Sequence, residues 1–115
     1  MRKVTIEIAG LSNATARVKE AWATRKERGE FISFESVPLM LRELTGKRWE
    51  IVHFLQNEGT MSIREVARQL GRDVKNVHAD IQALIRIGLV EQGKTGVSVP
   101  YDEIHANFTL KKHAA

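Results

Sequence analysis

The chain has no cysteine among its 115 residues. Disulfide bonds, thiolate metal sites and cysteine nucleophiles are therefore excluded, and the composition suits a reducing cytoplasm. The chain also lacks any apolar run close to the ~20 residues that a membrane-spanning helix needs. Its first residues lack the apolar stretch of a signal peptide. We therefore expect a soluble cytoplasmic protein with no membrane contact.

The charge balance is only mildly basic, with 18 Lys or Arg, 14 Asp or Glu and a net charge of +4. Such a balance is compatible with a polyanionic partner but does not require one. No linker, repeat or low-complexity segment is present. The length of 115 residues is that of one ordinary domain, so a second full domain does not fit.

Residues with catalytic or metal-binding chemistry are sparse. Asp102, Glu103 and His105 form the only cluster that suggests a metal or acid-base site. Neither a second ligand motif nor a nucleophile with a base partner accompanies it. The glycines at Gly93 and Gly96 lack the spacing of a phosphate-binding loop. We expect no enzyme, no bound metal and no cofactor.

Residues 62–90 carry the most informative pattern, which predicts two short helices joined by a tight turn. Ser62 and Glu65 have the spacing of a capping box that starts the first helix. Gly71 suits a helix end, and Asp73 suits the cap of the next helix. The apolar face of the first helix comprises Ile63, Val66, Ala67 and Leu70. The pattern is typical of a helix-turn-helix unit.

The second helix, residues 73–87, is predicted to bury Val74, Val77, Ile81 and Leu84. Its other face is polar, and in a helix-turn-helix protein such a face lies in the major groove of DNA. The residues predicted to contact bases are Lys75, Asn76, His78, Ala79 and Gln82. Each of them is also compatible with an ordinary exposed helix position. Asp80, between them, is predicted to join a surface ion pair instead.

The predicted unit is completed on both sides. Residues 89–92 and 97–99 predict a β-hairpin with Lys94 at its tip. Upstream, Thr45 is predicted to cap a helix that ends near Gly59. The apolar stripe predicted for that helix comprises Trp49, Val52 and Leu55, with Ile51 and Phe54 beside it.

Helix, capped helix, Leu70-Gly71, second helix, residues 88–90 and hairpin follow in the order seen in MarR-like winged helix-turn-helix proteins. The chain resembles this family over residues 45–100. Residues 99–110 also resemble the ending of a narrower prokaryotic group of DNA-binding transcriptional regulators, some of which are thought to pair with toxins. The resemblance implies that the polar face named above contacts bases and that Arg68, Arg72 and Lys94 contact phosphate or the minor groove. Arg64 and Thr95 are added to this predicted backbone and wing set.

The two ends of the chain predict a small sheet, because apolar and polar residues alternate there. The predicted strands contain Val4, Ile6 and Ile8, then Ile32 and Phe34, and finally Ile104, Ala106, Phe108 and Leu110. Residues 12–28 predict a helix that covers this sheet, and residues 36–44 a short connecting helix.

The predicted fold class is therefore α+β. A winged helix-turn-helix of three helices plus a hairpin, residues 45–100, is inserted in a flanking sheet. An N-terminal strand-helix-strand-helix extension, residues 1–44, and a C-terminal strand, residues 101–115, supply that sheet.

The predicted function is sequence-specific binding of double-stranded DNA by a prokaryotic transcriptional regulator, as a homodimer on half-sites about 10 to 10.5 base pairs apart. Winged helices also serve as protein-interaction modules. The alternative is therefore an antitoxin or adaptor that binds a partner protein, such as a toxin, through the flanking sheet.

Overall fold

The computed structural model describes residues 1–9 and 29–112. One sheet contains β1 (Lys3–Ile8), β2 (Glu30–Phe34) and β5 (Glu103–Ala106), and a separate hairpin contains β3 (Glu91–Gly93) and β4 (Gly96–Ser98). Between β2 and β3 lie four helices: α2 (Val37–Glu43), α3 (Gly46–Glu58), α4 (Ile63–Leu70) and α5 (Val74–Ile87). The chain is thus a small α+β domain, as predicted.

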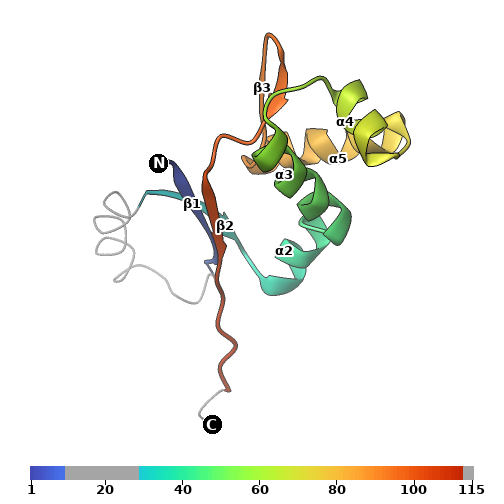
Figure 1. Cartoon of the computed structure of the whole chain (residues 1–115). Helices are drawn as coiled ribbons and strands as arrows, with labels where there is room; N and C mark the ends of the chain where they lie inside the picture. The colour runs from blue at the N-terminus through green and yellow to red at the C-terminus, as the bar shows by residue number, and fades with distance from the viewer. Residues whose placement is uncertain (10–28, 113–115) are drawn as a thin grey trace.

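The sheet joins the two ends of the chain (Figure 1). β1 lies in the centre and pairs in parallel with both neighbours, with Ile6 opposite Ile32 in β2 and Val4 opposite Ile104 in β5. Val4 and Ile6 are fully buried on the face that meets the helices. The predicted sheet is therefore confirmed, and the helix predicted to cover it, residues 12–28, lies outside the described residues.

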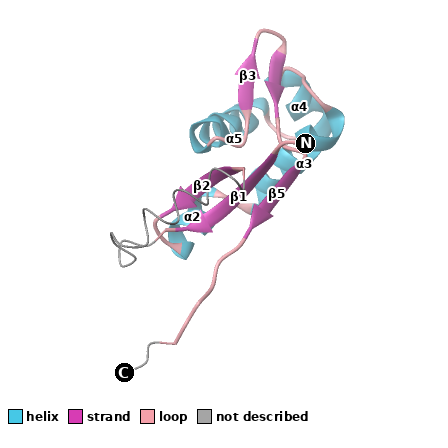
Figure 2. Ribbon diagram, turned by 90° about the vertical axis from the view of Figure 1, so that its left-hand side faces the viewer, coloured by secondary structure: helices cyan, strands magenta, loops and turns pink. Residues whose placement is uncertain are grey.

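The third strand is shorter than predicted. β5 ends at Ala106, after which the N–H of Asn107 donates to the C=O of Ile6 at 3.1 Å. Phe108 and Leu110, predicted as strand residues, are exposed at 43% and 80%. Figure 2 shows the chain leaving the body of the molecule there. Alternation alone does not make a strand, because the backbone groups also need a partner.

Side chains start the helices where the sequence predicts. Ser36 accepts from the N–H of Leu39 at 3.2 Å, Thr45 from Arg48 at 3.4 Å and Ser62 from Glu65 at 3.1 Å. Asp73 stands at the N-cap of α5, yet its side chain makes no capping bond. The prediction of a side-chain cap at Asp73 is therefore wrong, although the predicted helix start is confirmed.

The apolar face of α3 also differs from the prediction. Ile51, predicted to lie beside the stripe, is completely buried, as are Val52 and Leu55. Trp49, predicted within the stripe, is only partly buried. The helix is therefore turned so that Ile51 faces the core.

Among the described residues, no helix is long and apolar enough to cross a membrane.

One core connects the sheet and the helices, since Val4 and Ile6 share it with Ile51, Ile81 and Leu84. Tyr101 closes it near the hairpin, where its hydroxyl donates to the C=O of Gly88 at 3.2 Å. Arg2 lies over the Tyr101 ring, with its guanidinium carbon 5.0 Å from the ring centre. Arg2 and Tyr101, which precede β1 and β5, thus connect these strands to the end of α5.

Candidate nucleic-acid interface

α5 is held firmly along one face and open along the other. Val77, Ile81 and Leu84 have no exposed surface, and Gly88 ends the helix in the left-handed conformation at φ 104°. Because these anchors recur every three or four residues, the opposite face of the same helix is directed to solvent. Of the residues predicted to contact bases, Lys75, Ala79 and Gln82 are on that opposite face, and Asn76 and His78 flank it on either side.

The structure brings the predicted base-contacting residues together. Lys75, Asn76, His78 and Ala79 are all exposed, on the first two turns of α5. Gln82 lies one turn further along and is partly buried. Four of the five side chains are therefore available to a ligand that approaches the start of α5, and Gln82 is less accessible.

Val74 is not buried, and the prediction that it would be is wrong. It is the first residue of α5 and is 44% exposed. The buried series of the helix begins one turn later, at Val77. Val74 therefore adds an apolar side chain to the exposed start of the helix, beside Lys75. The sequence spacing alone assigns Val74 to the buried series. It does not show that Val74, as the first residue of the helix, has no preceding turn to pack beside it.

The corner between α4 and α5 is tight. Gly71 ends α4 in the left-handed conformation, at φ 64° and ψ 35°, and its N–H and that of Arg72 donate to the last carbonyls of α4. Val66 and Ala67 are buried and hold α4 to the core. Only Asp73 then separates Arg72 from α5, so the two helices have a fixed relation to each other.

Arg64 and Arg68, both predicted to meet the DNA backbone, are exposed on α4. Arg68 forms an ion pair with Glu65, with its Nε 2.9 Å from the carboxylate. Hydrogen bonds from Arg68 and then Gln69 lower the pKa of Glu65 to about 2. Both Glu65 oxygens are therefore occupied by side chains, and its reciprocal role in the capping box is not seen.

Arg72 has a different position from the other predicted phosphate ligands. Its Nη2 lies 2.7 Å from Asp80, and its side chain is only 16% exposed. The second oxygen of Asp80 accepts from Nε of Arg48, on α3, at 3.1 Å. Asp80 is thus an ion-pair residue, as predicted, but the pairs are partly buried and not at the surface. Arg72 links the corner to α5, which favours a structural contribution over direct phosphate contact.

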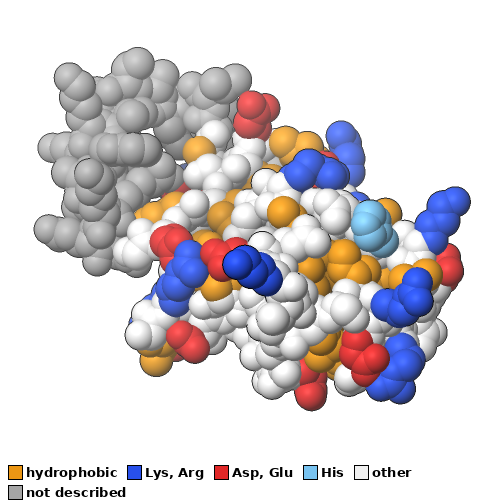
Figure 3. All heavy atoms as spheres, turned by 90° about the horizontal axis from the view of Figure 1, so that it is seen from above, with side chains coloured by type: hydrophobic (Ala, Val, Ile, Leu, Met, Phe, Trp, Pro, Cys, Tyr) orange, Lys and Arg blue, Asp and Glu red, His pale blue; other side chains and the backbone are white. Residues whose placement is uncertain are grey.

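The predicted hairpin is present, with Gly93 opposite Gly96, and Lys94 and Thr95 form its exposed turn. The backbone of Val97 exchanges two hydrogen bonds with that of Met61, at 2.8 and 3.2 Å. Met61 immediately precedes the cap of α4, so the hairpin is fastened to the start of that helix. Figure 3 shows Lys and Arg side chains gathered at the end of the molecule that carries α4 and α5.

A comparison with protein-family models matches residues 43–106 to the family described as HVO_A0114. These residues extend from the last residue of α2 to the end of β5 and make up more than half of the chain. The chain belongs to the HVO_A0114 family. No curated protein matches it.

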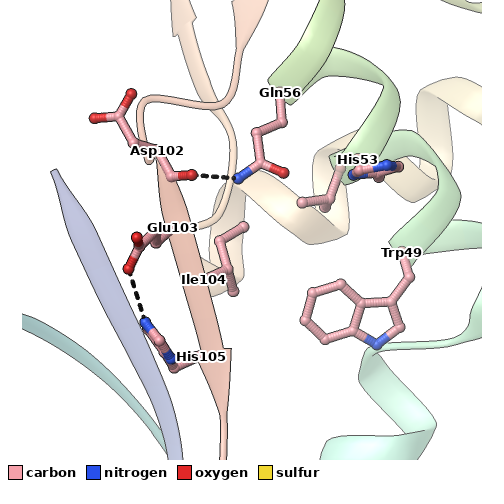
Figure 4. A pocket seen from close by; sticks show the side chains of 8 residues that line it. Trp49, His53, Gln56, Asp102, Glu103, Ile104 and His105 are labelled. Atoms are coloured by element: carbon pink, nitrogen blue, oxygen red, sulfur yellow. Dashed lines mark hydrogen bonds and ion pairs between the residues drawn. The ribbon is translucent and has the colours of Figure 1, made fainter. Parts of the chain in front are cut away.

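The part of the chain that matches HVO_A0114 also contains a shallow hollow of about 360 Å³ between α3 and β5 (Figure 4). It is lined by Trp49, Val52, His53, Gln56, Asp102, Glu103, Ile104 and His105. Within it, Nε2 of His105 lies 3.0 Å from Glu103, and that hydrogen bond lowers the pKa of Glu103. In the described part of the chain, no group of three or more His, Asp or Glu side chains is placed to hold a metal.

Proposed function

We propose that this protein is a sequence-specific DNA-binding transcriptional regulator. In this proposal α4 and α5 form a helix-turn-helix, the β3–β4 hairpin is its wing, and α5 enters the major groove. The arrangement needs a short corner, an anchored second helix and a hairpin next to the first helix. Each of these features occurs among the described residues.

The observation that carries the proposal is the contrast between the two faces of α5. Its inner face is completely buried, whereas its outer face presents Lys75, Asn76 and His78 to solvent. A protein-interaction surface is typically depleted of Lys and rich in aromatic or large apolar side chains at its centre. The amide, amine and imidazole groups of this face instead match the donors and acceptors on base edges.

Four of the exposed side chains on this face suit groups that a major groove presents. Asn76 suits the paired donor and acceptor of adenine, and Lys75 suits the two acceptors of guanine. Val74 and Ala79 offer apolar contact to a thymine methyl group. Arg64, Arg68, Lys94 and Thr95 flank this face and suit the phosphate backbone, which positions a protein without specifying sequence.

The proposal includes a second copy of the protein. A single recognition helix contacts only a few base pairs, and most helix-turn-helix proteins bind paired half-sites as dimers. We therefore propose a homodimer.

The test is fluorescence anisotropy with the protein's own upstream DNA and with a random duplex of equal length. Asn76→Ala should weaken binding to the specific DNA by about 1 to 3 kcal/mol and leave the random duplex nearly unaffected, because a base contact is lost. Arg64→Ala is the matched control on α4, and it should weaken binding to both duplexes alike, because a phosphate contact is lost. Equal losses on both duplexes from Asn76→Ala would overturn the assignment of this face.

A further inference from the structure

The outer edge of β5 is an unpaired strand edge. β5 is the last strand in the order β2-β1-β5, so no strand lies beyond it among the described residues. Backbone groups point alternately to the two edges of a strand. The N–H groups of Glu103 and Asn107 donate to the C=O groups of Arg2 and Ile6, at 3.4 and 3.1 Å, so these two residues direct their backbone groups towards β1. Ile104 and Ala106 alternate with them and therefore direct their backbone groups outward.

After Asn107 the sequence keeps the alternation of a strand, and no strand pairs with it among the described residues. Residues 107–112 have no secondary structure and extend away from the body (Figures 1 and 2). Phe108 and Leu110 are exposed, and they would share a face with Ile104 and Ala106 if the strand continued. An open edge beside an exposed alternating segment is a template for pairing with another strand.

We propose that two copies of this chain pair antiparallel through residues 102–112, with Asn107 on the twofold axis. In this register Ala106 lies opposite the partner's Phe108, and Ile104 lies opposite the partner's Leu110. A small residue thus faces a large one. The paired positions are those whose backbone groups point outward, so the same register also forms the interstrand hydrogen bonds.

Charge selects this register over its neighbour. With Asn107 on the axis, Glu103 lies opposite the partner's Lys111, and Asp102 lies opposite the partner's Lys112. Cross-strand pairs of opposite charge stabilise a sheet. Centring the pair on Ala106 instead would place Leu110 opposite Asp102 and remove both charge pairs.

The hollow between α3 and β5 provides space for the second copy. Ile104 points from β5 towards α3, on the side where Trp49 lies (Figure 4). The partner's Leu110, opposite Ile104, would extend the apolar surface at this hollow. Two three-stranded sheets would then join into one sheet of six strands with two edges fewer exposed.

This contact deepens the proposed function, because it names the surface of the homodimer assumed there. Its test uses no DNA, so either proposal can fail while the other stands.

The absence of cysteine makes the full chain suitable for disulfide mapping. Asn107→Cys would place two thiols on the axis with Cα atoms about 4.5 Å apart, within disulfide reach. Thr109→Cys is the matched control, since its two copies would lie about 13 Å apart along the strands.

The expected result is a covalent dimer from Asn107→Cys under mild oxidation, formed at least about tenfold faster than from Thr109→Cys. Equal rates for the two variants, or no dimer from either, would overturn the proposal.

A second experiment tests the charges by sedimentation. The variant Lys111→Glu/Lys112→Glu and the variant Asp102→Lys/Glu103→Lys should each be monomeric, because each brings like charges together, and their mixture should dimerise. A wild-type chain that stays monomeric at micromolar concentration would exclude a second copy and leave the β5 edge to a different protein. A mixture that remains monomeric would exclude this register.

Discussion

Asp80 makes more connections than any residue of the polar face that surrounds it. Its two oxygens accept from Arg48 of α3 and from Arg72 at the corner. Arg48 in turn donates to the C=O of Glu43 at 2.8 Å. One carboxylate therefore ties α5 to α3, to the corner and, through Arg48, to the end of α2. All three charged side chains are 20% exposed or less, so water screens their attraction only in part.

Asp80→Asn should lower the free energy of unfolding by about 1 to 3 kcal/mol, since two largely buried guanidinium groups lose their counter-charge. Urea denaturation would measure the change. Glu65→Gln is the control, because it removes a carboxylate from the exposed Glu65–Arg68 pair, and such pairs are worth about 0–1 kcal/mol. If both variants lose the same stability, Asp80 does not brace the helices.

For a single residue, the sequence predicts the kind of interaction better than it predicts the residues with which the interaction is made. Asp80 is identifiable as an ion-pair residue, because a carboxylate is repelled by the phosphates on either side of a DNA groove. Its partners Arg48 and Arg72 are 32 and 8 residues away, and only the packing of α3 against α5 brings Arg48 close. Arg72 therefore appears from sequence as an exposed cation, although the structure places it in this pair.

The position of the β3–β4 hairpin depends on one close contact, between Gly96 and the backbone of Met61. Gly96 has φ 138°, and a Cβ at this position would lie 2.3 Å from the C=O oxygen of Met61. Any side chain here would push β4 away from the start of α4. The position of the hairpin relative to α4, and of Lys94 at its tip, therefore requires glycine at 96.

Gly96→Ala should destabilise the protein by about 2 to 5 kcal/mol, because a strained backbone angle of about 1–2 kcal/mol is combined with overpacking of about 1–3 kcal/mol. Gly59→Ala is the matched control, since Gly59 has φ 85° and a methyl group added to its Cα would meet no other atom within 4 Å. It should cost only the backbone strain, about 1–2 kcal/mol. If thermal denaturation shows equal losses of stability for the two variants, the hairpin can move away from α4 without a further loss of stability.

Element boundaries follow from local chemistry, whereas element orientation does not. Ser36, Thr45 and Ser62 start their helices in the structure because a cap needs only its own turn. The face of α3 is harder to predict, since Trp49, Ile51, Val52, Phe54 and Leu55 surround the helix on several sides. Their sequence spacing does not decide whether Trp49 or Ile51 is buried. The packing of α3 against the rest of the core decides it. The end of β5 is likewise not set by the alternation, since β5 stops at Ala106 whereas its partner β1 continues to Ile8.

In the whole molecule, the matched family segment and the sheet overlap only in β5. The HVO_A0114 match includes β5 but neither β1 nor β2. β5 nevertheless pairs with β1, so residues outside the matched segment complete its fold. β5 thus has one edge taken by the chain's own beginning and, among the described residues, one edge free, which is the geometry required for a symmetric partner.

If both proposals hold, dimerisation should govern the salt dependence of DNA binding. Each phosphate contact changes the logarithm of the binding constant by about −0.9 per logarithmic unit of salt, and a dimer doubles the number of contacts. Phe108→Asp places a charge on the apolar side of the paired strands and should give a monomer whose salt slope is about half that of the wild type. The fold should persist, because Phe108 lies outside the core.

Thr109→Asp is the control for that prediction, since it adds the same charge one residue away, on the opposite face and across from His105. It should retain the dimer and the full slope, measured by anisotropy titrations over a range of salt concentrations. A halved slope for Phe108→Asp alone would connect the tail to DNA binding through the dimer. Equal slopes for wild type and both variants, with Phe108→Asp monomeric in sedimentation, would mean that one copy makes all the phosphate contacts.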